Sequence, residues 1–131
     1  MKKIKKYLSK KWVAVAWTLM VIILLAIPGK MIPEEPAFTI PQFDKVVHIV
    51  IFGLFVWLWS NHYASLNLNK RKLLKIFFLI FILGVVLGIG MEYVQKYFIP
   101  NRDFDEADII ADMIGAGLAY GVCNISMSGM E

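Results

Sequence analysis

The sequence predicts an all-α, polytopic membrane protein, a bundle of four transmembrane helices in one domain covering residues 1–131. Composition is the first observation: 59% of the residues are hydrophobic and 18% are charged, against roughly a quarter charged in a typical soluble domain. The second is that the apolar residues form four runs, and one bilayer crossing needs about 20 such residues. The third is that proline, glycine or polar residues interrupt the chain between the runs.

The predicted spans are residues 12–27, 46–60, 76–99 and 107–123. The first ends before Pro28 and Gly29, and the third ends at Pro100, because proline cannot donate the helical hydrogen bond. The second span is short, so we expect its helix to extend at both ends. The third is long enough to cross with a tilt.

The predicted connections differ in composition. Residues 28–43 contain three prolines beyond Pro28, together with two glutamates, which predicts an extended, solvated loop. Residues 61–75 are polar and then basic, with no acid, which indicates a cytoplasmic loop. Its basic cluster consists of Lys70, Arg71, Lys72 and Lys75.

Lysine and arginine residues are distributed unevenly about these spans. Ten lie in the amino-terminal segment and the 61–75 loop, and four lie on the other side. Basic residues favour the cytoplasmic side, so both termini are predicted to be cytoplasmic. We expect no signal-peptide cleavage, because no small-x-small site follows the first span.

The formal net charge of +4 predicts contact with membrane lipids, not with nucleic acid. The lysines lie beside apolar runs, where they meet anionic lipid headgroups, and they are not interleaved with aromatic base-stacking residues. Cys123 is the only cysteine, which excludes an intramolecular disulfide.

Polar residues gather near one end of spans two, three and four. This end lies on the opposite side of the membrane from the two chain termini. An isolated aspartate within hydrocarbon costs about 2.5–3.5 kcal/mol, so such residues are expected to pair or to form a functional site. The candidate residues are Asp44, His48, Glu92, Gln95, Arg102, Asp108 and Asp112.

Asp44 and His48 are four residues apart, so on a helix they share one face. An acid–imidazole pair there would orient the histidine as a general base or a metal ligand. The alternative is that Asp44 caps the helix while His48 hydrogen bonds a neighbouring helix.

Glu92 and Gln95 share a face with Gly84 and Gly88, which predicts a close helix contact around them. Glu92 lies too deep to reach the membrane surface easily, so we expect it to face protein or trapped water, either as a chemical group or as a polar clamp between helices.

Asp108 and Asp112 share a helix face with Gly115 and Ala119, and they need a counter-charge. Arg102 is the candidate, and its guanidinium would equally suit a phosphate.

Two smaller features of the last span have structural interpretations. Asp105 is interpreted as an ordinary helix cap. Gly117 and Gly121 form a G-x-x-x-G pattern, which we interpret as helix packing.

The polar positions, read in order, are similar to the VanZ-like family. The matching pattern is Asp44-Lys-Val-Val-His48, Glu92-x-x-Gln95, Pro100-x-Arg102 and Asp108-x-x-x-Asp112-x-x-Gly115-x-Gly117, and it covers residues 43–121. The family usually has asparagine where this chain has Asp112. The resemblance implies a small multi-pass protein of the bacterial cell membrane, whose founding member lowers susceptibility to the glycopeptide antibiotic teicoplanin.

We therefore expect a polar pocket that opens toward the outer leaflet and binds or modifies an envelope lipid or glycolipid headgroup. Arg102 would hold the anion, with Gln95, Asp108 and Asp112 as further binding residues. In an enzymatic version His48 with Asp44 would be the general base and Glu92 the acid.

No nucleophile motif is present, so an enzyme would activate water, with a divalent metal as a possible aid but no other cofactor. The alternative is a non-catalytic module whose polar cluster is structural and which binds antibiotic, lipid or a partner protein. A transporter fits less well, since the polar groups lie on one side only. The sequence specifies no oligomeric state.

Overall fold

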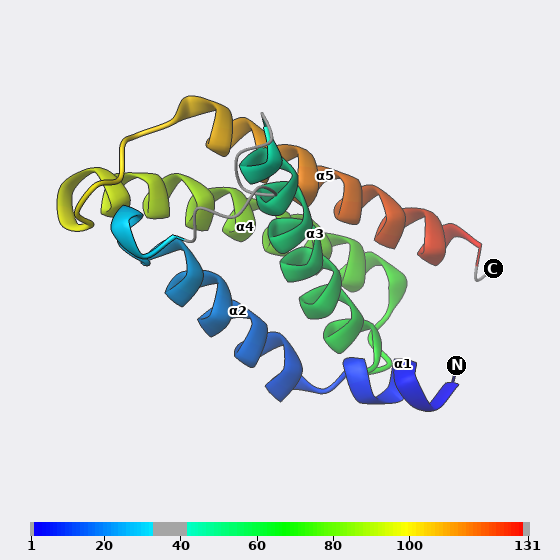
Figure 1. Cartoon of the computed structure of the whole chain (residues 1–131). Helices are drawn as coiled ribbons and strands as arrows, with labels where there is room; N and C mark the ends of the chain where they lie inside the picture. Colours follow the sequence, from blue (N-terminus) through cyan, green and yellow to red (C-terminus); the bar gives the residue numbers. More distant parts are fainter. Residues whose placement is uncertain (1, 33–41, 130–131) are drawn as a thin grey trace.

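The computed structural model describes residues 2–32 and 42–129, and these form helices joined by short turns (Figure 1). The prediction of an all-α membrane bundle is confirmed, with no strand among the described residues. The elements are α1 (Lys2–Leu8), α2 (Lys11–Leu25), a 3-10 turn η1 (Gly29–Met31), α3 (Phe43–Ala64), α4 (Lys70–Phe98) and α5 (Glu106–Ser128).

Three helices, α3, α4 and α5, are long and apolar enough to cross a membrane. The helices α1 and α2 are bent by 61° relative to each other, and counting this pair as one broken span gives up to four. By itself α2 has 15 residues, about 22 Å at 1.5 Å per residue, which is shorter than the roughly 30 Å hydrocarbon layer.

The predicted loop over residues 61–75 is shorter than expected. Helix α3 continues through Asn61 and His62 to Ala64, and the basic cluster 70–75 forms the first turns of α4. Asn69 caps α4 by accepting a hydrogen bond from the Lys72 backbone at 2.8 Å. The prediction of a loop over 61–75 was therefore wrong, because a good cap allows the charged residues to continue the helix. In the 28–43 connection, residues 33–41 lie outside the described residues.

The bundle has two distinct ends (Figure 1). One, here the terminal end, holds both ends of the chain and the turn between α3 and α4. The other, here the site end, is where α3 and α5 begin and α4 finishes. Buried apolar side chains fill the length between them, from Phe52 and Met91 through Val56 and Ala116 to Phe77.

Two tryptophans join α2 to α3. The indole N–H of Trp17 donates to the Ile51 carbonyl at 2.9 Å, and that of Trp59 donates to the Thr18 hydroxyl at 3.0 Å. The buried ends of these amphipathic rings thus find polar partners. Trp12, by contrast, has an exposed side chain, as expected of a tryptophan in the aromatic belt at a membrane interface.

The contact between α3 and α5 depends on glycine. A Cβ atom at Gly115 would overlap the Ile49 carbonyl group, and one at Gly53 would lie 3.3 Å from the Gly115 oxygen. By contrast, a Cβ at Gly121 would meet no atom within 4 Å. A Cβ at Gly117 would meet only the Phe81 ring at 3.9 Å. The interpretation of Gly121 as a packing residue was therefore wrong, and the close approach is made at Gly115.

We expect Gly115→Ala to destabilise the protein by about 1–3 kcal/mol, the usual cost of overpacking, since backbone atoms of α3 cannot move aside independently. Gly121→Ala is the matched control and should leave stability unchanged. Thermal unfolding of the detergent-purified variants measures both. Equal tolerance of alanine at the two positions would contradict the close approach of α3 and α5.

Candidate functional site

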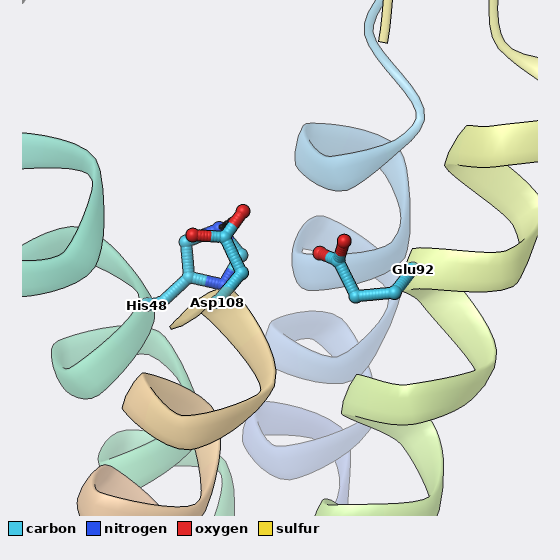
Figure 2. A group of neighbouring side chains, drawn as sticks. All are labelled: His48, Glu92 and Asp108. Carbon is cyan, nitrogen blue, oxygen red and sulfur yellow. Dashed lines mark ion pairs between the residues drawn. The ribbon is translucent and has the colours of Figure 1, made fainter. Parts of the chain in front are cut away.

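The site end of the bundle carries a group of charged side chains from three helices. His48 lies in the second turn of α3, Glu92 lies about two turns before the end of α4, and Asp108 lies in the first turn of α5. Figure 2 shows the Glu92 carboxylate pointing from α4 toward His48 and Asp108. The polar cluster, as the term is used below, consists of Lys45, His48, Glu92, Asp105, Asp108 and Asp112.

Lys45 neutralises the outer part of the polar cluster. Its ammonium group forms ion pairs with Asp44 at 2.8 Å, with Asp105 at 2.5 Å and with Asp108. The hydrogen bond from Lys45 lowers the pKa of Asp105 below its usual value. Asp105 also caps α5 as predicted, by accepting from the Ala107 backbone at 2.8 Å.

The expected pairing of Arg102 with Asp108 and Asp112 was wrong. Lys45 pairs with Asp108 and His48 pairs with Asp112, so both carboxylates have their partners on α3. Among the described residues, Arg102 Nε is buried without a hydrogen-bond partner. The arginine lies in the turn between α4 and α5.

His48 is oriented by α5 and not by its own helix. Its Nδ1 lies 2.7 Å from Asp112 Oδ1 and its Nε2 lies 3.6 Å from Asp108 Oδ2. Because an ionised carboxylate only accepts, the short contact places a proton on Nδ1. The expected Asp44–His48 pair was wrong: within the described chain no hydrogen bond or ion pair joins them, and Asp44 points to Lys45 at the surface.

Glu92 is almost fully buried, with 1% of its surface exposed. Its Oε2 accepts a hydrogen bond of 3.0 Å from the Asp105 backbone, which ties the end of α4 to the start of α5. Gln95, by contrast, lies outside the polar cluster. Its amide donates to the Leu25 carbonyl at 2.8 Å and so satisfies the last turn of α2, which argues against the predicted role in binding.

Glycine also makes room for Asp112. A Cβ at Gly88 would lie 2.6 Å from Asp112 Oδ2, whereas one at Gly84 would meet the Phe55 and Val56 side chains at 3.4 Å. The predicted close contact around these glycines is therefore with side chains, not with backbone. Asp112 Oδ2 itself is buried without a hydrogen-bond partner among the described residues.

His48, Glu92 and Asp108 have the geometry of a metal-binding triad. One ligand atom from each lies within 4.8 Å of the other two. Two ligands bound at about 2.1 Å to a tetrahedral metal are about 3.4 Å apart, close to the 3.6 Å between His48 Nε2 and Asp108 Oδ2. In the neutral imidazole, the Nδ1–H···Asp112 bond leaves Nε2 unprotonated and facing Asp108, which is the arrangement in which a histidine binds a metal.

A second acidic trio, Asp44, Asp105 and Asp108, has similar spacing, but the Lys45 ammonium already lies among its oxygens. Sequence reasoning missed Lys45 and the ion pair of Asp105. The signal was the spacing of Lys45 three residues before His48, which places both on one face of α3.

We expect Asp112→Asn to keep the fold and the His48 orientation, because the amide oxygen still accepts from Nδ1–H and a buried charge is removed. Metal affinity should fall about tenfold, as when other hydrogen bonds that orient a metal-binding histidine are weakened. Asp112→Ala, which removes the acceptor, should lose both more affinity and stability. Thermal unfolding and metal titration of the two variants test this, and an unfolded Asp112→Asn protein would contradict it.

The fold and the polar cluster define a helical integral membrane protein with an acidic, histidine-containing group at one end of its bundle. A family model described as VanZ/LLP1 matches residues 1–127. The chain therefore belongs to the VanZ family, as its polar pattern predicted.

One relative comes from fission yeast. An uncharacterized protein of Schizosaccharomyces pombe is 34% identical over 101 residues, which cover 77% of this chain and 59% of the relative. The chain thus spans little more than half the length of that protein. No solved structure matches the chain.

Proposed function

We propose that this protein binds a divalent cation through His48, Glu92 and Asp108, and through that cation holds the phosphate of an envelope lipid or glycolipid headgroup. The observation that carries the proposal is the convergence of the three ligand atoms within 4.8 Å from three different helices. One imidazole and two carboxylates suit Zn²⁺ or Mn²⁺ better than a softer, thiolate-binding metal.

The charge balance of the site favours a cation as the first ligand. Five carboxylates meet there, those of Asp44, Glu92, Asp105, Asp108 and Asp112. Lys45 and His48 are the basic side chains that pair with the four aspartates, and Glu92 accepts from the Asp105 backbone. A phosphate alone would be repelled by the excess negative charge. A divalent cation compensates the acids and still offers open positions to phosphate oxygens.

Arg102 is the protein group that we assign to the anion. Its Nε is buried without a partner among the described residues, and leaving a charged donor unsatisfied is costly. A headgroup phosphate held between the metal and the guanidinium fork would satisfy it.

The sidedness of this site follows from the distribution of basic residues. With cytoplasmic termini, the site end faces the outer leaflet, where envelope lipids and lipid-linked cell-wall components are exposed. Altered susceptibility to a glycopeptide such as teicoplanin would then be a consequence of changed headgroup availability. The similarity to a fungal protein favours a ligand chemistry that bacteria and fungi share, as phosphate headgroups are.

Modification of the headgroup is the second candidate, favoured by the Asp112–His48 contact. A carboxylate that orients an imidazole is the arrangement of a general base, and a bound metal would supply an activated water. A non-catalytic module, in which the polar cluster only joins the helices, is the competing hypothesis.

The test is lipid retention by protein purified in mild detergent, with and without a chelator. We expect co-purified phospholipid or glycolipid phosphate to fall several-fold after chelation, and to return when Zn²⁺ or Mn²⁺ is restored to protein supplied with the same lipids. Arg102→Gln should weaken retention while leaving metal binding intact. The proposal would be contradicted if the amount of retained lipid changed neither on adding the chelator nor in Arg102→Gln.

A further inference from the structure

The terminal end of the bundle holds a second feature, unrelated to the polar cluster. A cavity of about 440 Å³ lies between α1 and the ends of α3 and α5, within the usual range for small-molecule sites. Its apolar wall includes Trp57, Phe77, Val122 and Met127. We call it the basic pocket, because Lys2, Lys5 and Lys6 form its rim.

Helix α1 presents one face to this pocket. Lys2, Lys5, Lys6 and Ser9 all line it, and their spacing of three and four places them on one side of a helix. The other side carries Ile4, which is exposed. The 61° bend between α1 and α2 turns α1 away from the direction of the spans, as in a helix that lies at the membrane surface.

The position of α1 over the pocket is fixed by a contact from α3. His62 Nδ1 donates to the Ser9 carbonyl at 3.0 Å, so the turn after α1 is tied to the end of α3. The three lysines on the rim nevertheless form no ion pair with any acidic side chain of the described residues. Their charge is therefore available to an external anion.

A buried hydroxyl lines the same pocket. Ser60 is 1% exposed, and its Oγ has no hydrogen-bond partner in the described part of the chain, although the Cys123 thiol lies beside it. A thiol is only a weak partner for a hydroxyl. Buried polar groups normally find a partner, so a ligand oxygen reaching into the pocket would complete this site.

We propose that the basic pocket binds one anionic phospholipid, with its phosphate on Lys2, Lys5 and Lys6 and part of its apolar body against Trp57 and Phe77. Ser60 donates to an ester oxygen of the same molecule. The combination of cationic rim, apolar wall and buried donor matches a phospholipid and neither a free phosphate nor a neutral lipid. The site is separate from the polar cluster and does not depend on the function proposed there.

Native mass spectrometry of the full chain, delipidated and titrated with dioleoyl phosphatidylglycerol, tests this. With a chelator present, so that no metal holds lipid at the polar cluster, we expect one lipid per chain, much weaker binding of dioleoyl phosphatidylcholine, and no competition by inorganic phosphate. The triple variant K2Q/K5Q/K6Q should weaken binding on the order of 100-fold. The matched control K3Q/K10Q/K11Q removes the same charge from residues that do not line the pocket, and it should bind as wild type.

A second variant separates the pocket from general surface charge. Val122 is 57% exposed, so Val122→Trp should fold, and its side chain should fill the pocket and abolish phosphatidylglycerol binding. Any of four results would overturn the proposal. The two triple variants could lose binding equally, or the neutral lipid could bind as well as phosphatidylglycerol. Inorganic phosphate could compete, or Val122→Trp could bind normally.

Discussion

Glu92→Gln is expected to lower divalent-cation affinity by at least about 100-fold while the protein stays folded. Substituting a group that only supports a metal ligand costs up to about 100-fold, and Glu92 is itself a proposed ligand. The amide removes the negative charge that a metal needs. It keeps an oxygen that can accept the 3.0 Å hydrogen bond from the Asp105 backbone. The substitution therefore separates the chemical role of Glu92 from its structural one.

Isothermal titration of Zn²⁺ or Mn²⁺ into the purified variant measures this loss, and thermal unfolding without metal measures the fold. Asp103→Asn is the matched control, since it makes the same change of charge at an exposed position in the turn before α5. A Glu92→Gln protein that fails to accumulate in the membrane, or that binds metal as wild type does, would favour the polar cluster as structural only.

Lys45→Gln should have the second large effect, a loss of about 1–3 kcal/mol in stability. The Lys45 side chain is 21% exposed and pairs with three carboxylates, and removing it leaves these acids without their ammonium partner. Breaking a fully buried pair costs about 3–5 kcal/mol, and partial exposure to water reduces that figure.

A divalent cation should partly replace the missing ammonium group in Lys45→Gln. Asp44, Asp105 and Asp108 offer oxygens within 4.8 Å of one another, so Ca²⁺ or Mn²⁺ should restore part of the lost stability of Lys45→Gln. Thermal unfolding across a metal titration measures the rescue. Lys30→Gln, an exposed lysine at the same end, should show neither the loss nor the rescue. A stable Lys45→Gln protein would contradict the role given to this residue.

Hydropathy was sufficient to predict α2, α3, α4 and α5, but it predicted neither α1 nor all of the helix ends. The apolar runs predicted α3, α4 and α5, because a long apolar segment in a bilayer has to satisfy its backbone within a helix. The ends at Ala64 and Lys70 were missed, since charged and polar residues continue a helix without any hydropathy signal. Capping by Asn69 was the relevant information.

The candidate residues were predicted better than their pairing. Spacing along one helix suggested Asp44 for His48, whereas the partner is Asp112 on α5. That choice depends on how closely α3 and α5 approach, which Gly53 and Gly115 determine, and on the register between the helices. Neither can be derived from spacing within one segment. Lys45 was missed because a lysine beside a span resembles an ordinary topology signal.

The central claim is that His48, Glu92 and Asp108 form a cation site. Its most direct test is Mn²⁺ binding to the metal-free protein, followed by electron paramagnetic resonance, in wild type and in His48→Ala, Glu92→Gln and Asp108→Asn. The account predicts one tightly bound Mn²⁺ per wild-type chain and its loss in each folded variant. Wild-type protein that binds no Mn²⁺ or Zn²⁺, or variants that bind as wild type does, would contradict it.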